Sequence, residues 1–297
     1  MRIAVTGAAG QLAAALLPKL CARVDVTSVI GIDRIPGAFR HAKFTPVTAD
    51  IRDPRALRVL SEASALVHLA FVLQRGRMPQ AEMRASNIDG SRAVLYAARG
   101  IERIVHLSTA AVYGSGVDLT EDAPLRPWPR FQYACEKAEL ESWIARELPH
   151  AVVLRPAPIL GPHALPLLRQ LIRAPLYVRL PEPQPVLQCV HEDDVADAII
   201  AALTSGVGGT FNIAAPDAFA LRDLVRSRRP RALAVPLPVA RAAVAVAWRM
   251  TGWGGEAGWI DAVGQSLTLD CRRAEIVLEW RPRHRRWREI VATLPND

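Results

Sequence analysis

The chain begins with Met1-Arg2-Ile3-Ala4-Val5-Thr6-Gly7-Ala8-Ala9-Gly10-Gln11-Leu12-Ala13. The apolar residues 3–5 are typical of a buried strand, and residues 11–21 have the pattern of a helix. A turn this short needs glycine where a side chain would clash or where φ is positive. The amino terminus of the following helix presents free N–H groups to a pyrophosphate. We therefore expect Gly7, Gly10, Gln11 and Leu12 to bind a dinucleotide; a purely structural turn is the alternative, which the strand–turn–helix context disfavours.

Short apolar segments alternate with helical patterns through the first two thirds of the chain. Strands are expected at 3–5, 26–30, 66–69, 104–107 and 151–154, and helices at 11–21, 54–62, 80–99 and 132–148. Such alternation implies parallel strands joined by helical crossovers. Short, continuously apolar strands fit a sheet that is covered on both faces. The sequence predicts an α/β fold with a Rossmann-type doubly wound parallel sheet.

The pattern changes near residue 156, beyond which prolines are frequent up to residue 185. The helical segment 192–200 is expected to return to the main sheet. We therefore expect a dinucleotide-binding domain over 1–162 that also includes about 186–214. Residues 163–185 and 215–297 are expected to form a small C-terminal substrate-binding lobe over the cleft.

The chain has 297 residues, 51% of them hydrophobic, which is enough to bury a sizeable core. Its net charge of +8 would suit a nucleic acid if the cations were clustered. Only Lys19, Lys43 and Lys137 are lysines, and the arginines are scattered, so no nucleic-acid partner is expected. The densest basic run, 281–288, is expected to be a solvated tail helix. Binding of a phosphate or of an acidic membrane surface by this run is the alternative.

The four cysteines are scattered without paired spacing, so neither a disulfide framework nor a metal site is expected. There is no uninterrupted apolar run of about 18 residues, which a spanning helix would need. The amino-terminal residues lack the long apolar segment of a secretory signal. These features favour a cytoplasmic protein with reduced thiols.

Asp33 ends the second expected strand, in Gly31-Ile32-Asp33-Arg34. A carboxylate at this place can accept hydrogen bonds from the adenosine ribose hydroxyls and would repel a 2′-phosphate. Arg34 is the opposing feature, because a guanidinium could hold that phosphate. We expect NAD rather than NADP as the cofactor, with both residues near its adenosine.

Further segments follow in a fixed order along nearly the whole chain. They are Asp50-Ile51, His68-Leu69-Ala70-Phe71, Asn87, the run 107–114 that contains Thr109, Tyr133-Ala134-Cys135-Glu136-Lys137, Leu154-Arg155-Pro156 and the run 190–195. In this ordered series the chain resembles the extended short-chain dehydrogenases, the NAD-dependent epimerase/dehydratase family.

The resemblance implies roles for individual residues of the cofactor site. Asp50 and Ile51 would contact the adenine. Leu69, Ala70 and Phe71 would run beside the cofactor, and Asn87 would belong to the same site. The resemblance also implies a homodimer that pairs through the helices expected at 80–99 and 132–148.

The resemblance further implies a catalytic trio of Thr109, Tyr133 and Lys137, and elementary chemistry agrees. Tyr133 and Lys137 are four residues apart, so on a helix they share one face. A phenol with a pKa near 10 is a poor base at neutral pH, but a nearby ammonium and a cationic nicotinamide stabilise the phenolate. Tyr133 can then exchange a proton with a substrate hydroxyl that Thr109 aligns, while Lys137 anchors the cofactor ribose.

Two departures from the family pattern bear on the reaction. Sugar-nucleotide dehydratases of this family carry an Asp-Glu pair directly after the catalytic Thr, and here Ala110 and Ala111 occupy those positions. Many members that use nucleotide sugars have an asparagine two residues after the Arg-Pro pair, and here that position is Pro158. A site that desolvates a diphosphate and several hydroxyls needs many polar partners, and this largely apolar segment offers few. Arg169, Arg173 and Arg179 further along the chain could still supply phosphate contacts.

Three hypotheses follow for the small-molecule chemistry. The first is a secondary alcohol–ketone oxidoreductase acting on a fairly apolar substrate, such as a sterol or terpenoid. The second is a nucleotide-sugar 4-epimerase that uses the same trio, and the third is a non-catalytic NAD-binding regulator. Residues 237–249 add a hint of weak membrane contact through an amphipathic helix, with a core-packing helix as the alternative.

Overall fold

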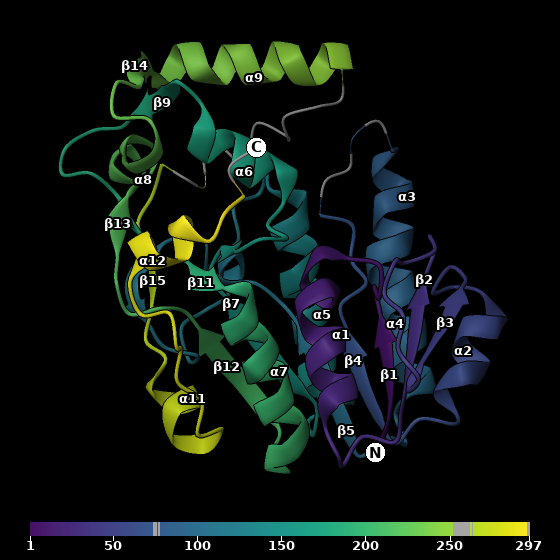
Figure 1. Cartoon of the computed structure of the whole chain (residues 1–297). Helices are drawn as coiled ribbons and strands as arrows, with labels where there is room; N and C mark the ends of the chain where they lie inside the picture. Colours follow the sequence, from purple (N-terminus) through teal and green to yellow (C-terminus); the bar gives the residue numbers. More distant parts are fainter. Residues whose placement is uncertain (74–75, 77, 252–261, 263, 296–297) are drawn as a thin grey trace.

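Seven parallel strands form the central sheet of the protein, whose computed structural model describes residues 1–73, 76, 78–251, 262 and 264–295 (Figure 1). Their order is β12-β7-β5-β4-β1-β2-β3. The strands are β1 (Arg2–Thr6), β2 (Ser28–Asp33), β3 (Phe44–Thr48), β4 (Ala65–His68), β5 (Arg103–Leu107), β7 (Val152–Pro156) and β12 (Gly209–Ile213). The order reverses between β1 and β4, and such a switch point is where parallel α/β sheets bind their ligands. The predicted α/β Rossmann-type fold is confirmed.

Helices cover both faces of this sheet because its strands alternate apolar side chains between two cores. Ile3 and Val5 of β1 pack in one core with residues of α1 and α7, whereas Ala4 between them packs in the other core with residues of α2, α4 and α5. The helices are α1 (Gln11–Ala22), α2 (Pro54–Leu60), α4 (Ser91–Ala97), α5 (Gln132–Glu147) and α7 (Glu192–Ser205). The strand and helix positions predicted from the sequence agree with these bounds to within a few residues.

The continuous helix predicted over 80–99 is interrupted in the structure. It divides into α3 (Gln80–Arg84), the π-helical turn η1 (Ala85–Gly90) and α4. Gly90 lies where a side chain would meet Ile51, since a Cβ built there would be 2.9 Å from Ile51 Cδ1. π-helical turns occur often at functional sites, and η1 contains Asn87 of the predicted cofactor site.

The arginines of the basic run 281–288 are exposed, as the sequence predicted, but most of the run is not helical. Helix α12 (Trp287–Ala292) includes only its last two residues. The backbone N–H groups of Arg283 and His284 donate to the buried carboxylate of Asp194 at 2.8 and 3.1 Å. The side chain of Trp280 donates to the Asp194 carbonyl at 2.9 Å. These bonds fix the basic run against the start of α7.

A smaller group of elements packs beside the carboxyl ends of the main strands. Its sheets have the orders β13-β10-β15-β6 and β14-β9, and β8 pairs with β11. The strands are β6 (Gly116–Leu119), β8 (Ile159–Leu160), β9 (Leu176–Arg179), β10 (Val186–Leu187), β11 (Val190–His191), β13 (Phe219–Ala220), β14 (Leu233–Pro236) and β15 (Leu267–Leu269). The helices are α6 (Pro166–Arg173), α8 (Leu221–Arg228), α9 (Leu237–Thr251) and α12, whereas α11 (Arg272–Val277) packs against β12 of the main sheet.

The predicted substrate-binding lobe, 163–185 and 215–297, corresponds to most of these elements; its residues 252–261, 263, 296 and 297 lie outside the described part. The sheet β13-β10-β15-β6 also takes β6 from the segment assigned to the dinucleotide-binding domain, so the domain boundary stays a prediction. Helix α9 lies across the outer end of the lobe (Figure 1). None of the described helices, α9 included, combines the length and hydropathy that crossing a bilayer requires.

Candidate active site

The turn after β1 brings two loops of the switch point into close contact. Gly7 has φ +74°, and its N–H donates to the carbonyl of Ile32 at 2.9 Å. A Cβ built on Gly7 would lie 2.7 Å from the backbone nitrogen of Ala70, in the turn after β4. Glycine is therefore required both by the positive φ and by the neighbouring backbone.

The amino terminus of α1 fits the pyrophosphate of a dinucleotide. Gly10 is its N-cap residue and has no side chain to accept hydrogen bonds from the first turn, and this turn contains no acidic residue. Gln11 and Leu12, both half-buried, start the helix directly behind the turn. Uncapped N–H groups and the positive end of the helix dipole together favour an anion here.

Asp33 lies beside this turn at the end of β2. One carboxylate oxygen accepts the N–H of Ala9 at 2.9 Å, and the other accepts the N–H of Ile35 at 3.2 Å. These bonds hold the carboxylate next to the glycine turn, where ribose hydroxyls could reach its remaining lone pairs. Arg34 is exposed. The N–H groups at the start of α1 and the carboxylate of Asp33 thus fit the pyrophosphate and the ribose of NAD.

Asp50 and Ile51 follow β3 at the same edge of the sheet. The Asp50 carboxylate pairs with Arg52 at 2.9 Å, and this guanidinium holds the pKa of Asp50 below its usual range. Ile51 is buried against Gly90. The Asp50 carboxylate thus has a partner within the protein, and contact of the two residues with the adenine stays a prediction.

Asn87 in η1 holds the turn that follows β4. Its amide oxygen accepts the N–H of Val72 at 2.6 Å, and its amide nitrogen donates to the Val72 carbonyl at 3.0 Å. The same nitrogen donates to Glu136 of α5 at 2.8 Å. Asn87 therefore fixes the run of Leu69, Ala70 and Phe71 relative to α5. Both of its amide hydrogens are engaged within the protein, which the sequence did not reveal.

The structure brings Thr109, Tyr133 and Lys137 together. Thr109 caps the 3₁₀ turn η2 (Ala110–Tyr113) after β5, and its hydroxyl is near enough to the half-buried phenol of Tyr133, at the start of α5, to lower the pKa of that phenol. The ring of Phe71 contacts both Tyr133 and Lys137. It lies edge-on to the Tyr133 ring with 5.6 Å between centroids, and the Lys137 Nζ is 3.8 Å from its centroid. The ammonium of Lys137 also donates to the carbonyl of Leu107 at the end of β5.

Apolar surroundings shift the pKa of both titratable members of the trio. Burial lowers the pKa of Lys137 to about 7, partly offset by the carboxylate of Glu141. Burial raises the pKa of Tyr133, partly offset by the hydrogen bond with Thr109. In the ligand-free protein the phenol is therefore protonated at neutral pH, and a further cation beside it would be needed to draw its pKa down.

A buried polar network connects α5 to the neighbouring strand β7 and to the segment after β5. Glu141, four residues after Lys137, accepts the Ser108 hydroxyl and two bonds from Arg155 at 2.6 and 2.9 Å. Arg155 also donates to the Tyr113 hydroxyl at 2.7 Å, which donates onward to Asn212 at 2.7 Å. This network was not predicted from the sequence. The position of Glu141 next to Lys137 was predictable, because i,i+4 residues on a helix are neighbours.

Two histidines lie side by side beneath the site and are both neutral. His68 bonds to Thr6 at 2.7 Å and to Ser91 at 2.9 Å, and burial together with Lys137 lowers its pKa to about 3. His106 is its register partner on β5, with 5.4 Å between ring centroids, and burial holds its pKa well below the usual value. Within the described part of the chain, neither ring nitrogen of His106 has a hydrogen-bond partner.

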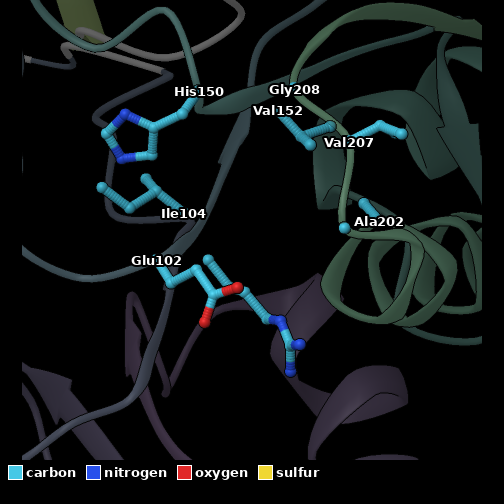
Figure 2. A pocket seen from close by; sticks show the side chains of 9 residues that line it. Glu102, Ile104, His150, Val152, Ala202, Val207 and Gly208 are labelled. Atoms are coloured by element: carbon cyan, nitrogen blue, oxygen red, sulfur yellow. The ribbon is translucent and has the colours of Figure 1, made fainter.

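A pocket at the opposite edge of the sheet is separate from this site. Figure 2 shows His150 and Glu102 on one side of it and Val207 on the other. It lies at the amino ends of β5 and β7, whereas the trio lies at the carboxyl ends. Over the described residues, no cluster of three or more His, Cys, Asp or Glu side chains could hold a metal ion.

The family model for the NAD-dependent epimerase/dehydratase family matches residues 3–214. The chain belongs to this family. It is therefore an NAD-dependent enzyme, in agreement with the Asp33 carboxylate and the uncapped start of α1.

Relatives and solved structures agree with this assignment. An uncharacterized protein of Mycobacterium tuberculosis is 29% identical over 256 residues, covering 80% of this chain and 67% of that protein. A ketoreductase of Stigmatella aurantiaca, named for 4-hydroxy-2-methyl-3-oxo-4-farnesyl-3,4-dihydroquinoline-1-oxide, is 28% identical over 70% of this chain and 66% of its own length. The structure of the UDP-glucose 4-epimerase of Thermotoga maritima has a TM-score of 0.74 at 22% identity, covering 98% of this chain and 96% of that one. This last likeness concerns the fold alone.

Substituting Gly7 by alanine should impair both cofactor binding and folding. The residue would adopt a positive φ and press on the Ala70 nitrogen, which costs about 1–3 kcal/mol of unfolding free energy and displaces the turn. We expect NAD affinity, measured by calorimetry, to fall at least roughly tenfold. Gly100→Ala is the control, because a Cβ there meets nothing within 4 Å. Equal NAD affinity of Gly7→Ala and wild type would contradict this site.

Replacing Lys137 by methionine should change how stability depends on pH. The lysine pKa is about 7 in the folded protein and 10.5 in the unfolded chain, so the unfolded chain binds more protons between these values. Wild-type stability therefore gains up to about 1.4 kcal/mol per pH unit across this window. Urea unfolding of Lys137→Met should lack this gain, and the variant should exceed wild type most at pH 7. Identical pH slopes in the two proteins would show that the ammonium is not desolvated.

Proposed function

We propose that this enzyme interconverts a secondary alcohol and a ketone on a fairly apolar substrate, with Thr109, Tyr133 and Lys137 as its catalytic residues. The observation that carries the proposal is the convergence of three side chains: the Thr109 hydroxyl approaches the Tyr133 phenol, and the Phe71 ring contacts both Tyr133 and the buried ammonium of Lys137. Two hydroxyls that meet in this way can both reach one substrate oxygen. The oxygen that gains or loses a proton would take the place between them.

The chain's residues would divide the chemistry as follows. Bound NAD⁺ supplies a hydride acceptor and a positive charge. Tyr133 removes the proton from the substrate hydroxyl during oxidation and returns it during reduction. Thr109 donates to or accepts from the same oxygen and fixes its direction. Lys137 stabilises the phenolate form of Tyr133 and binds ribose hydroxyls, for which it would exchange its contact with Phe71.

Apolar residues around the trio support a poorly polar substrate. Phe71 and Phe131 lie with their ring centroids 5.6 and 5.7 Å from that of Tyr133. Ala110, directly after Thr109, is buried and carries no acid or base. The acid–base pair that sugar-nucleotide dehydration would require is absent from positions 110 and 111. The ketoreductase of Stigmatella aurantiaca, whose printed substrate carries a farnesyl chain, gives this proposal a relative of matching chemistry.

We also propose contacts for the rest of the cofactor, a homodimer and two alternative functions. The adenosine end of NAD would contact Asp50 and Ile51, and Leu69, Ala70 and Phe71 would run beside the nicotinamide end. Two copies would pair through α3, α4 and α5 in a cytoplasmic homodimer. A nucleotide-sugar 4-epimerase would use the same trio without net reduction of NAD⁺, and a regulator would bind NAD⁺ without any turnover.

Tyr133→Phe should abolish turnover while leaving NAD binding intact. Removing a general acid–base group costs roughly 10²–10⁴-fold in rate. The measurement is nicotinamide absorbance with NAD⁺ and a panel of sterols, terpenoid and aliphatic secondary alcohols, and UDP- or dTDP-sugars. We expect net NADH from an apolar alcohol with wild type and with the control Tyr96→Phe, at an exposed tyrosine of α4.

Other outcomes would contradict the proposed function. Inversion of a sugar without net NADH, detected by NMR, would establish the epimerase instead. Equal turnover by Tyr133→Phe and wild type would exclude this tyrosine as the acid–base group.

A further inference from the structure

Helix α9 presents an apolar stripe to the outside of the molecule. Val239 and Val246 are each 56% exposed and Met250 is 70% exposed. Ala242 and Ala243 between them are exposed as well. These positions recur at intervals of three or four residues, so they lie along one side of the helix. A globular protein normally directs such a stripe towards its core, and here it points away from it.

The strands beside α9 extend this apolar surface. Leu176 of β9 and Leu233 of β14 are register partners, and they are 47% and 68% exposed. Helix α9 follows β14 directly and packs on both strands. The elements that carry these exposed side chains, α9, β9 and β14, lie at the outer end of the lobe (Figure 1).

Exposed arginines lie on α9 and in the segment that precedes β14. The segments 163–185 and 215–251, which build this end of the lobe, contain ten arginines and three acidic residues. Arg229 and Arg231 are exposed just before β14, and Arg241 and Arg249 are exposed on α9 itself. An exposed apolar stripe with exposed arginines elsewhere on the same helix and before it matches a helix that lies in the plane of an anionic lipid surface.

We propose that α9, with the adjoining strands β9 and β14, docks the enzyme onto an anionic membrane surface. The helix would lie along the interface with Val239, Val246 and Met250 among the acyl chains and its arginines among the phosphates. The charge argues against a second copy of this chain as the occupant, because two such faces would bring like charges together. The proposal does not require the proposed reaction, although a membrane would concentrate an apolar substrate.

Vesicle cosedimentation of the full-length protein tests the proposal without any activity assay. The probes are vesicles of phosphatidylcholine alone and vesicles with about one quarter phosphatidylglycerol, at roughly 0.1 M salt. We expect wild type to sediment with the anionic vesicles at least tenfold more than with the neutral ones. Val239→Glu/Val246→Glu should lose at least tenfold of this binding. Ile276→Glu is the matched control, since Ile276 is 77% exposed on α11, which packs against β12 well away from α9 (Figure 1).

Three outcomes would overturn the proposal. They are no binding of wild type to anionic vesicles, equal binding by wild type and Val239→Glu/Val246→Glu, and equal loss in Ile276→Glu. Light scattering adds a fourth, because a wild-type oligomer that Val239→Glu/Val246→Glu dissociates would make this face an interface between copies. A dimer through α3, α4 and α5 would instead persist in the variant. The substituted residues are exposed, so the melting temperature should stay within about 2 °C of wild type.

Discussion

The burial of one ammonium group, that of Lys137, constrains the whole site. Its Nζ lies 3.8 Å from the Phe71 ring and donates to the carbonyl of Leu107, so water is largely replaced by an aromatic face and a single acceptor. A cation in such a place is costly unless other groups hold it. The turn after β4, the end of β5 and the first turns of α5 must therefore keep fixed positions. Asn87 holds the turn after β4 through its hydrogen bonds with Val72, and Gly7 packs against the Ala70 backbone in the same turn.

Glu141 connects this cation to the rest of the fold. It lies one helical turn beyond Lys137 and pairs with Arg155 of β7, which reaches Asn212 of β12 through Tyr113. Asn212 in turn donates to the carbonyls of Leu119 and Asp270 at 2.8 and 3.1 Å, at the ends of the paired strands β6 and β15. Helix α5 and the smaller group of elements thus share one hydrogen-bonded network. Loss of Glu141 or of Arg155 from it would leave the other charge buried and unpaired.

The sequence predicted the features that follow from local patterns. The strand–turn–helix around Gly7 and the alternation of apolar segments led to the correct fold class, and the spacing of Tyr133 and Lys137 placed them on one helix. It did not predict the π-helical turn η1, because a helical pattern does not show one extra residue per turn. It also wrongly predicted a helix over residues 281–288, whose backbone bonds to Asp194 depend on a contact almost ninety residues away. The pairing of Glu141 with Arg155 was not predicted for the same reason, because it joins a helix and a strand that meet only in the fold.

The central claim is that the Lys137 ammonium and the positive charge of bound NAD⁺ together activate Tyr133. Ultraviolet difference absorbance of the phenolate, recorded against pH with and without NAD⁺, tests it most directly. Burial raises the Tyr133 pKa in the free protein. The account predicts that NAD⁺ brings the ionisation of one tyrosine below a pKa of about 10, and that this ionisation is missing from Tyr133→Phe. An unchanged tyrosine titration on adding NAD⁺, or a change that persists in Tyr133→Phe, would contradict the account.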